Sequence, residues 1–371
     1  MRSMDGEQVT KAVTGAVAAL RAGGDQDWSE VIAGRLEWTC LRTAEHLTGA
    51  LCGYAGQLTA RARDARVPLY TTLRDGVDHE GILQSIETAA VLLATVIAAT
   101  PREVRGFHPL PFRSANREGF AAMAVTEIVL HTHDMAEGLG IAYEPEAELC
   151  EDVLTRLFPH VRPGPDHWRT LLWATGRGDL PGHAPVTSWR WSNNLVIPTE
   201  RLTLQGITPA AAMDLRQGGS GGFEWLDGSP YEGTRDAAGM LVKAYESGVH
   251  RPEWGMFALV RSEDGRAVGA IGFHGTPDEE ERAEIGYDLV EGARGHGYAT
   301  EALCALADWA MTGDGGEDDA TYGFGFGAKH SVKELLATVE RTNIPSQRVV
   351  ERAGFAQVGE GQGTYAYALR P

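Results

Sequence analysis

The chain has 371 residues, of which 43% are hydrophobic and 23% charged, and its formal net charge is −18. This composition is that of a globular protein and excludes wholesale disorder, while the length favours two domains. The negative charge argues against a nucleic-acid partner, because binding to a phosphate backbone requires a cationic surface. The four cysteines form no CxxC pair, which fits a reducing cytoplasm.

The first half of the chain predicts successive helices, because apolar residues recur every three or four positions up to about residue 175. The longest apolar run, 88–100, is too short to span a bilayer and is expected to be a bundle helix, so no membrane partner is expected. The expected helices cover residues 7–21, 27–61, 80–99, 115–138 and 146–158.

The helical pattern breaks at GRGDLPGHAPVTSWRWSNN, where Pro181 and Pro185 cannot continue a helix. Beyond it, short strand-like runs such as GMFALVR and AEIGYDLV alternate with helical stretches at 296–311 and 345–353. Strands that alternate with helices indicate an α/β layer. The expected architecture is an all-α domain followed by an α/β domain, with the bounds 1–192 and 193–371.

The most specific motif is EIGYDLVEGARGHGYATEALCALADWA, in which a strand ends near Leu289 and a glycine-rich turn opens a helix. Gly295 and Gly297 allow backbone amides to approach a ligand closely, and the helix start adds unpaired N–H groups with a positive dipole end. These features predict a diphosphate site. On this pattern alone, an ordinary strand–helix turn is an equal alternative.

The order Arg294-x-x-Gly297-x-Ala299 resembles the acetyl-CoA signature of the GNAT N-acetyltransferases. NIPSQRVVERAGF resembles the asparagine-to-Gly-Phe block of the same family, and PTERLTLQGIT resembles its opening strand. The resemblance covers residues 195–371, is closest to the RimJ and RimL branch, and implies a mixed, mostly antiparallel sheet.

This resemblance implies that acetyl-CoA is the cofactor. Backbone amides of the glycine-rich turn would hold the diphosphate of the cofactor. The edge of the preceding strand, at its C-terminal end, and an asparagine further along the chain would bind the pantetheine arm. The implied cofactor residues are Leu289, Val290, Arg294, Gly295, His296, Gly297, Tyr298, Ala299, Thr300 and Asn343.

Acetyl transfer to an amine needs a base for the nucleophile and an acid for the leaving thiolate. Glu284, on the motif strand, is the expected base, acting through a water molecule; the alternative is a solvated strand carboxylate. Many family members carry a tyrosine four residues before the glycine of the Gly-Phe pair, and this tyrosine protonates the leaving thiolate. This chain has Val350 at that position. Ser346 is the expected substitute, and its alternative role is to cap the helix that begins there.

Two further segments are expected near the acceptor. Glu224, Trp225 and Asp227 lie where this family's acceptor-binding helices and loop usually come. The segment 312–330 is longer than the usual connection between the cofactor-binding helix and the next strand in this family. It is interpreted either as a lid over the acceptor site or as a surface loop. The negative net charge weakly favours a cationic acceptor.

The helical half contains a second candidate site. Glu127 and His131 are four residues apart and therefore project from one helix face. His46, in another amphipathic segment, is the expected third ligand, and two histidines with one glutamate are typical of catalytic zinc. Asp134 is expected to orient His131, and His133 is expected to point elsewhere. A chance pairing on a helix face is the alternative.

W-x-C-x-R-x-A-x-H-L and E-x-x-x-H-x-x-D-x-A-x-x-x-G together resemble the DinB-like, mycothiol-dependent maleylpyruvate isomerase N-terminal domain over residues 8–192. The resemblance implies that the His, Glu and His bind a metal that activates a thiol. In those isomerases a small C-terminal domain completes the thiol and substrate pocket, whereas here an acetyltransferase stands in its place. The isomerase activity therefore does not follow from the resemblance.

The leading prediction is an acetyl-CoA-dependent N-acetyltransferase for a primary amine, either a small molecule or a peptide N-terminus. One alternative is a metal- and thiol-dependent transferase or isomerase, with the acetyltransferase domain as an accessory. The other is a non-catalytic acyl-CoA-binding module, suggested by Val350.

Overall fold

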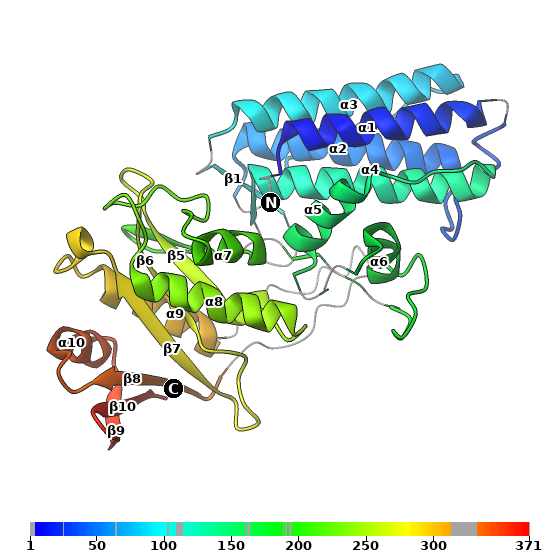
Figure 1. Cartoon of the computed structure of the whole chain (residues 1–371). Helices are drawn as coiled ribbons and strands as arrows, with labels where there is room; N and C mark the ends of the chain where they lie inside the picture. The colour runs from blue at the N-terminus through cyan, green and yellow to red at the C-terminus, as the bar shows by residue number, and fades with distance from the viewer. Residues whose placement is uncertain are drawn as a thin grey trace. The chain divides into compact units, whose positions relative to one another are not determined.

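The computed structural model describes residues 4–24, 26–63, 65–101, 104–108, 114–159, 161, 164–187, 189, 191–192, 195–312 and 332–370. The chain divides into two compact units, Met1–Asn193 and Asn194–Pro371 (Figure 1). From residue 313 on, the expected lid at 312–330 lies outside the described residues.

The first unit is a helical bundle. An N-cap side chain that accepts a backbone N–H begins each of its four long helices, and such caps contribute about 1 kcal/mol each. The caps are Asp5, Thr39, Asp78 and Asn116. The helices of the unit are α1 (Gly6–Leu20), α2 (Cys40–Ala60), α3 (His79–Ala99), α4 (Arg117–Leu139), α5 (Ala147–Leu157) and α6 (His167–Ala174), with a 3-10 turn at Arg21–Gly23.

Within this bundle, α1 and α2 each pack against both α3 and α4, and α5 packs against α4 (Figure 1). α4 is buried around most of its circumference and places Glu127 and His131 inside the bundle. α3 is long and apolar enough to cross a membrane by length and composition, but Leu83, Ile86 and Leu93 on one of its faces are buried in the bundle core.

The helices expected at 7–21, 80–99, 115–138 and 146–158 correspond to α1, α3, α4 and α5. The helix expected over 27–61 is wrong in its first third, because α2 begins only at Cys40. Residues 27–39 form turns with a bridge between Ile32 and Thr39, and Gly34 adopts a left-handed φ of +50°.

The first unit also departs from the expected all-α class. β1 (Arg105–Phe107) and β2 (Ser114–Asn116) form a two-stranded antiparallel ladder before α4. Apolar periodicity gave no signal for strands this short.

The second unit is an α/β domain with one eight-stranded sheet in the order β3-β4-β5-β6-β7-β8-β10-β9. Every neighbouring pair is antiparallel except β7 and β8, which are parallel, so the sheet is mixed and mostly antiparallel as expected. The strands are β3 (Val196–Pro198), β4 (Leu202–Gly206), β5 (Met256–Arg261), β6 (Ala267–Phe273), β7 (Arg282–Leu289), β8 (Glu334–Glu340), β9 (Ala356–Glu360) and β10 (Thr364–Leu369).

Helices cover both faces of this sheet. Successive β7 side chains alternate between faces: Tyr287 contacts α10, and Asp288 contacts α8. α7 packs on α8, and α9 packs on α10, so the two pairs lie on opposite faces, as the green and orange helices of Figure 1 show. These helices are α7 (Pro209–Arg216), α8 (Glu232–Glu246), α9 (Tyr298–Thr312) and α10 (Ile344–Arg352), with 3-10 turns at Pro252–Trp254 and Glu291–Ala293.

Candidate functional site

The expected cofactor site begins where β7 separates from its parallel neighbour. β7 pairs with β8 only through 282–284, whereas its pairing with β6 runs over 285–289. Among the described residues, the β8-facing edge of β7 therefore has no ladder partner from Ile285 to Leu289. An unpaired strand edge offers backbone N–H and C=O groups to an extended ligand.

The glycine-rich turn follows this open edge. Gly295 and Gly297 have φ values of +80° and +83°, which glycine adopts without the penalty of a side chain, and α9 begins at Tyr298. The first N–H groups of a helix have no acceptor within the helix and carry the positive end of its dipole. Arg294 to Thr300 thus have the backbone geometry that an anion-binding turn requires, and their role as the diphosphate site stays a prediction.

Leu289 and Val290 already have partners inside the protein. The carbonyl of Leu289 accepts hydrogen bonds from Arg294 Nε and Nη2, both at 3.3 Å. The Val290 N–H donates to Val268 O at 3.0 Å. Pairing of a ligand with Leu289 O requires Arg294 to release it, and the N–H of Val290 is taken.

Arg201 holds the glycine-rich turn in place, and its role was not predicted. Its Nε lies 2.7 Å from Glu301 Oε2 in the first turn of α9, and its Nη1 donates to His296 O at 2.9 Å. Its guanidinium carbon also lies 4.9 Å from the centre of the Tyr298 ring, within cation–π range. Burial acts to raise the pKa of Glu301, but hydrogen bonds from Thr199 and Arg201 lower it.

Glu284 has a histidine partner that the sequence did not reveal. His274 Nδ1 lies 3.4 Å from Glu284 Oε2, and both side chains are partly exposed, at 46% and 38%. The backbone N–H of His274 donates to Glu284 O at 2.9 Å, which fixes the two residues side by side. Glu284 is therefore paired with an imidazole as well as accessible to solvent.

The residues of α10 take different roles from those considered. Asn343 is the N-cap of α10, and its side chain accepts the N–H of Ser346 at 3.1 Å. Ser346 therefore does not cap the helix; its Oγ lies 2.7 Å from the hydroxyl of Tyr287 on β7. Val350 is fully buried. Burial raises the pKa of Tyr287, although the hydrogen bond with Ser346 acts in the opposite direction.

The three expected acceptor contacts are dispersed. Glu224 forms an exposed ion pair with Arg266 at 3.0 Å. Trp225 is 4% exposed and its backbone bridges to Ala267, so it is a packing residue. Asp227 accepts the N–H of Gly292 at 2.9 Å and holds the turn after β7.

Asp288 is a further acid, half-buried on the α8 side of β7. Its Oδ1 accepts a hydrogen bond from Thr234 Oγ1, in the first turn of α8, at 2.8 Å. Burial raises its pKa to about 6, against smaller opposing contributions from the bonds to Thr234 and the Ala270 N–H and from Arg294. The sequence shows Asp288 as an acidic residue within the strand motif, but it does not show how far the side chain is shielded from solvent.

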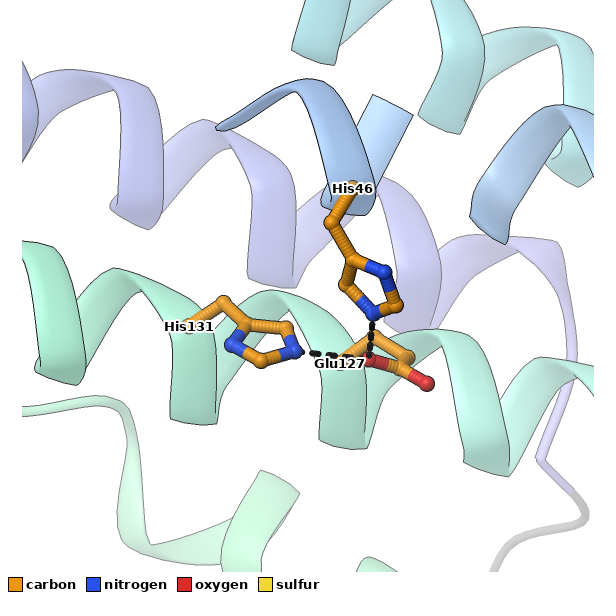
Figure 2. A group of neighbouring side chains, drawn as sticks. All are labelled: His46, Glu127 and His131. Atoms are coloured by element: carbon orange, nitrogen blue, oxygen red, sulfur yellow. Dashed lines mark ion pairs between the residues drawn. The ribbon is translucent and has the colours of Figure 1, made fainter. Parts of the chain in front are cut away.

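The helical unit brings His46, Glu127 and His131 together, with one ligand atom of each lying within 4.8 Å of the others. Glu127 Oε2 lies 3.0 Å from His131 Nε2 and 3.6 Å from His46 Nε2 (Figure 2). His46 comes from α2 and the other two from α4, and all three point toward one another. Two imidazole nitrogens and one carboxylate oxygen are a donor set that fits Zn²⁺.

Outer contacts orient these three side chains. His131 Nδ1 lies 3.1 Å from Asp134 Oδ2, and Arg177 bonds both oxygens of Asp134 at 2.9 Å. The Tyr54 hydroxyl donates to the second oxygen of Glu127 at 3.0 Å. A metal-binding histidine usually has such a carboxylate on its other nitrogen.

The charges of the group are strongly coupled. Burial acts to raise the pKa of Glu127, but hydrogen bonds from His131 and His46 hold it well below its usual range. Burial acts to lower the pKa of His131, yet bonds to Asp134 and Glu127 raise it to about 9. The arrangement suits either a divalent cation or a closed ion pair.

His133 lies apart from this group, as its position on α4 implies. Its ring contacts Trp168 edge-on with centroids 5.4 Å apart, and its Nε2 lies 3.7 Å from Glu137 Oε1.

Residues 201–356 match the family model described as Acetyltransferase (GNAT) domain. The second unit contains a GNAT acetyltransferase domain. "Uncharacterized N-acetyltransferase YjdG" of Bacillus subtilis is 30% identical over 97 residues, which are 26% of this chain and 48% of that protein. "Uncharacterized N-acetyltransferase p20" of Bacillus licheniformis is 29% identical over 103 residues, which are 28% and 49%. The chain thus spans about half the length of the curated relatives it matches.

Solved structures also align with the chain. The GNAT-family acetyltransferase from Bacillus anthracis is 20% identical, with a TM-score of 0.32, over 47% of this chain and 98% of that one. The ribosomal-protein-S5-alanine acetyltransferase from Vibrio fischeri is 14% identical, with a TM-score of 0.32, over 47% and 96%.

Proposed function

We propose that this protein is an acetyl-CoA-dependent N-acetyltransferase that acts on a primary amine. The observation that carries the proposal is the open edge of β7, over 285–289, which is followed, after the short 3-10 turn at Glu291–Ala293, by the glycine turn at the start of α9. An extended arm beside the strand and a diphosphate at the helix start match the two parts of coenzyme A. The GNAT domain match over 201–356 supports the same activity.

In this proposal the backbone of Arg294 to Thr300 binds the diphosphate, and Asn343 bonds the pantetheine arm through the amide nitrogen that its capping role leaves free. The amine attacks the thioester carbonyl directly, so no covalent enzyme intermediate forms. Glu284 lies on β7 immediately before its open edge and is part of the proton-accepting group. The hydroxyl pair of Tyr287 and Ser346 protonates the departing thiolate.

The acceptor is a small amine or a peptide N-terminus. Glu284 and Asp288 lie on the same face of β7, and a cationic amine is attracted to such a face. The acidic net charge of −18 favours the same class of acceptor.

Isothermal titration with acetyl-CoA tests the cofactor part of the proposal. A Cβ at Gly297 would lie 3.4 Å from Arg201 Nη2, and an indole there would fill the anion-binding turn, so Gly297→Trp is expected to abolish binding. Gly248→Trp is the matched control, because Gly248 has a φ of +72°, open space around it and a position after the far end of α8. No heat with the wild type, or equal binding by Gly297→Trp, contradicts the proposal.

A second candidate function rests on the helical unit. We propose that His46, Glu127 and His131 bind a divalent ion, with Zn²⁺ favoured by the donor set, and that this site serves a thiol-dependent transfer or isomerisation. When bound, the ion would lower the pKa of a thiol or water at an open position. His46 is 39% exposed at its side chain, which leaves the site reachable from solvent.

Metal analysis of the purified protein tests this second proposal. His46→Ala removes one of three donors and is expected to release the metal, whereas His167→Ala, outside the group, is expected to retain it. Equal metal content in wild type and His46→Ala, or no metal after incubation with Zn²⁺, shows that the three residues form an ion pair only.

A further inference from the structure

His274 lies directly over β7 at the position of a glycine. It follows β6, and its Nδ1 faces Glu284 Oε2 at 3.4 Å. Its Nε2 lies at the other end of the ring, only 2.7 Å from where a Cβ on Gly286 would stand. Because residues 284 and 286 share one face of the strand, the imidazole lies along that face, with Nε2 toward the open half of β7.

We propose that His274 Nε2 is the group that takes the proton from the acceptor amine, and that Glu284 is a positioning residue for the ring. The inference rests on the proposed acetyl transfer and reassigns its base. The Glu284 carboxylate, 3.4 Å from Nδ1, favours a proton on that nitrogen, which leaves Nε2 as the acceptor, and it stabilises the imidazolium once the proton arrives.

The position of His274 suits this role. β7 loses its β8 partner after Glu284, so a thioester held along the open edge lies beside Gly286, under the ring. The His274 side chain is 46% exposed, which allows an amine to approach Nε2 from solvent. Within the described residues no hydrogen bond to His274 Nε2 is formed, so this nitrogen is available.

The proton and the bonds balance as follows. The amine nitrogen forms a bond to the thioester carbon, and one of its protons moves to His274 Nε2. The C–S bond then breaks and leaves an amide and a thiolate. The thiolate receives a proton from the hydroxyl pair of Tyr287 and Ser346. The proton on His274 passes to solvent, and solvent returns one proton to the hydroxyl pair, so both groups regain their starting states.

Gly286 is the residue that gives the ring its place. A methyl group there would meet the far end of a rotatable side chain rather than backbone, so Gly286→Ala is expected to fold and to push the His274 ring aside. This variant changes the position of the base without removing it.

The test compares CoA thiol release from acetyl-CoA by wild type, His274→Ala, Glu284→Gln and Gly286→Ala. The acceptors are spermidine, an alanine-terminated peptide and water alone, the last allowing slow hydrolysis through the same base. His274→Ala is expected to lower kcat about 100-fold or more, with acetyl-CoA binding by titration unchanged. Added imidazole is expected to restore part of the activity of His274→Ala, which a merely structural role would not allow.

The other variants sharpen the comparison. Gly286→Ala is expected to reduce kcat, and the double variant with His274→Ala is expected to lose no more than His274→Ala alone. Glu279→Gln, at an exposed acid in the connection between β6 and β7, is the control for Glu284→Gln and is expected to match wild type.

The results separate this inference from the proposed function. Unchanged kcat in His274→Ala, or no rescue by imidazole, overturns the role of His274 while acetyl-CoA binding stands. Absence of acetyl-CoA binding overturns the proposed function itself. If acetyl-CoA binds but no CoA is released in the presence of any of the three acceptors, both the role of His274 as the base and the proposed acetyl transfer are overturned.

Discussion

The hydroxyl of Tyr287 lies 2.7 Å from Ser346 Oγ, although the two residues are 59 positions apart in the chain. Val350, the position where many relatives are expected to carry an acidic tyrosine, is fully buried. Position 350 of α10 therefore offers no hydroxyl group. The nearby hydroxyl groups are those of Tyr287 on β7 and Ser346 on α10. Burial raises the pKa of Tyr287, so it remains a proton donor at neutral pH.

Removal of this pair is expected to slow the departure of the thiolate. Ser346→Ala and Tyr287→Phe are each expected to lower kcat by about tenfold or more, with the Kd for acetyl-CoA nearly unchanged. Steady-state CoA release and calorimetric titration measure the two quantities. Tyr365→Phe, on β10 beside Arg341, is the control. If both variants turn over as fast as wild type, the hydroxyl pair has no part in the chemistry.

Arg201 is expected to contribute to cofactor affinity through the shape of the turn. It bonds Glu301 and His296 O, so Arg201→Ala frees the segment that presents the amides. Binding of acetyl-CoA is expected to weaken about tenfold, which corresponds to about 1.4 kcal/mol. Arg216→Ala, on an exposed position of α7, is expected to bind normally. An unchanged Kd for Arg201→Ala contradicts the positioning role.

Asp288 is expected to make the stability of the second unit depend on pH. Its folded pKa is raised from 3.8 to about 6, so the folded protein holds this proton more tightly than the unfolded chain does. Ionisation of Asp288 therefore costs stability that grows as pH rises from about 4 to about 6, by up to about 3 kcal/mol.

Carboxyl ¹³C NMR and urea unfolding between pH 4 and 7 check this prediction. Asp288→Asn keeps an acceptor for Thr234 and is expected to remove the pH-dependent loss, whereas Asp308→Asn on the exposed face of α9 is expected to leave it. A titration midpoint for Asp288 below pH 4.5 would refute the prediction.

Asp134 is expected to set the metal affinity of the helical unit without contacting the ion. It bonds His131 Nδ1 and is itself held by Arg177. Asp134→Ala is expected to weaken Zn²⁺ binding by about 10- to 100-fold, measured by competition with a chelating dye. Glu137→Ala, one turn later beside His133, is the control. Equal affinities would show that Asp134 serves folding only.

Local patterns predicted much of the fold. The period of apolar residues located α1, α3, α4 and α5, because each presents one or more buried faces to the same core. The same rule failed at residues 27–39, where Trp28 and Ala33 are buried but belong to turns. Ile32 is exposed there, and Gly34 together with the Thr39 cap determines the backbone.

The contacts within the candidate sites also fall into those that local sequence patterns predict and those that they do not. The glycine turn is a continuous motif, and Glu127 and His131 share a helix face by spacing, so the sequence alone brought these residues together. Arg201 and Glu301 meet across 100 positions, and His274 meets Glu284 across a hairpin. Contacts of this kind depend on strand order and register, which no local pattern encodes.

The central claim is acetyl transfer to a primary amine by the GNAT domain. Its most direct test is mass spectrometry of a panel of primary amines and peptides after incubation with acetyl-CoA and the full chain. The account predicts that at least one amine gains a single acetyl group with wild-type protein and none does with Gly297→Trp, while Gly248→Trp behaves as wild type. The same acetylated product at the same rate with Gly297→Trp, or no acetylated amine at all with wild type, would contradict it.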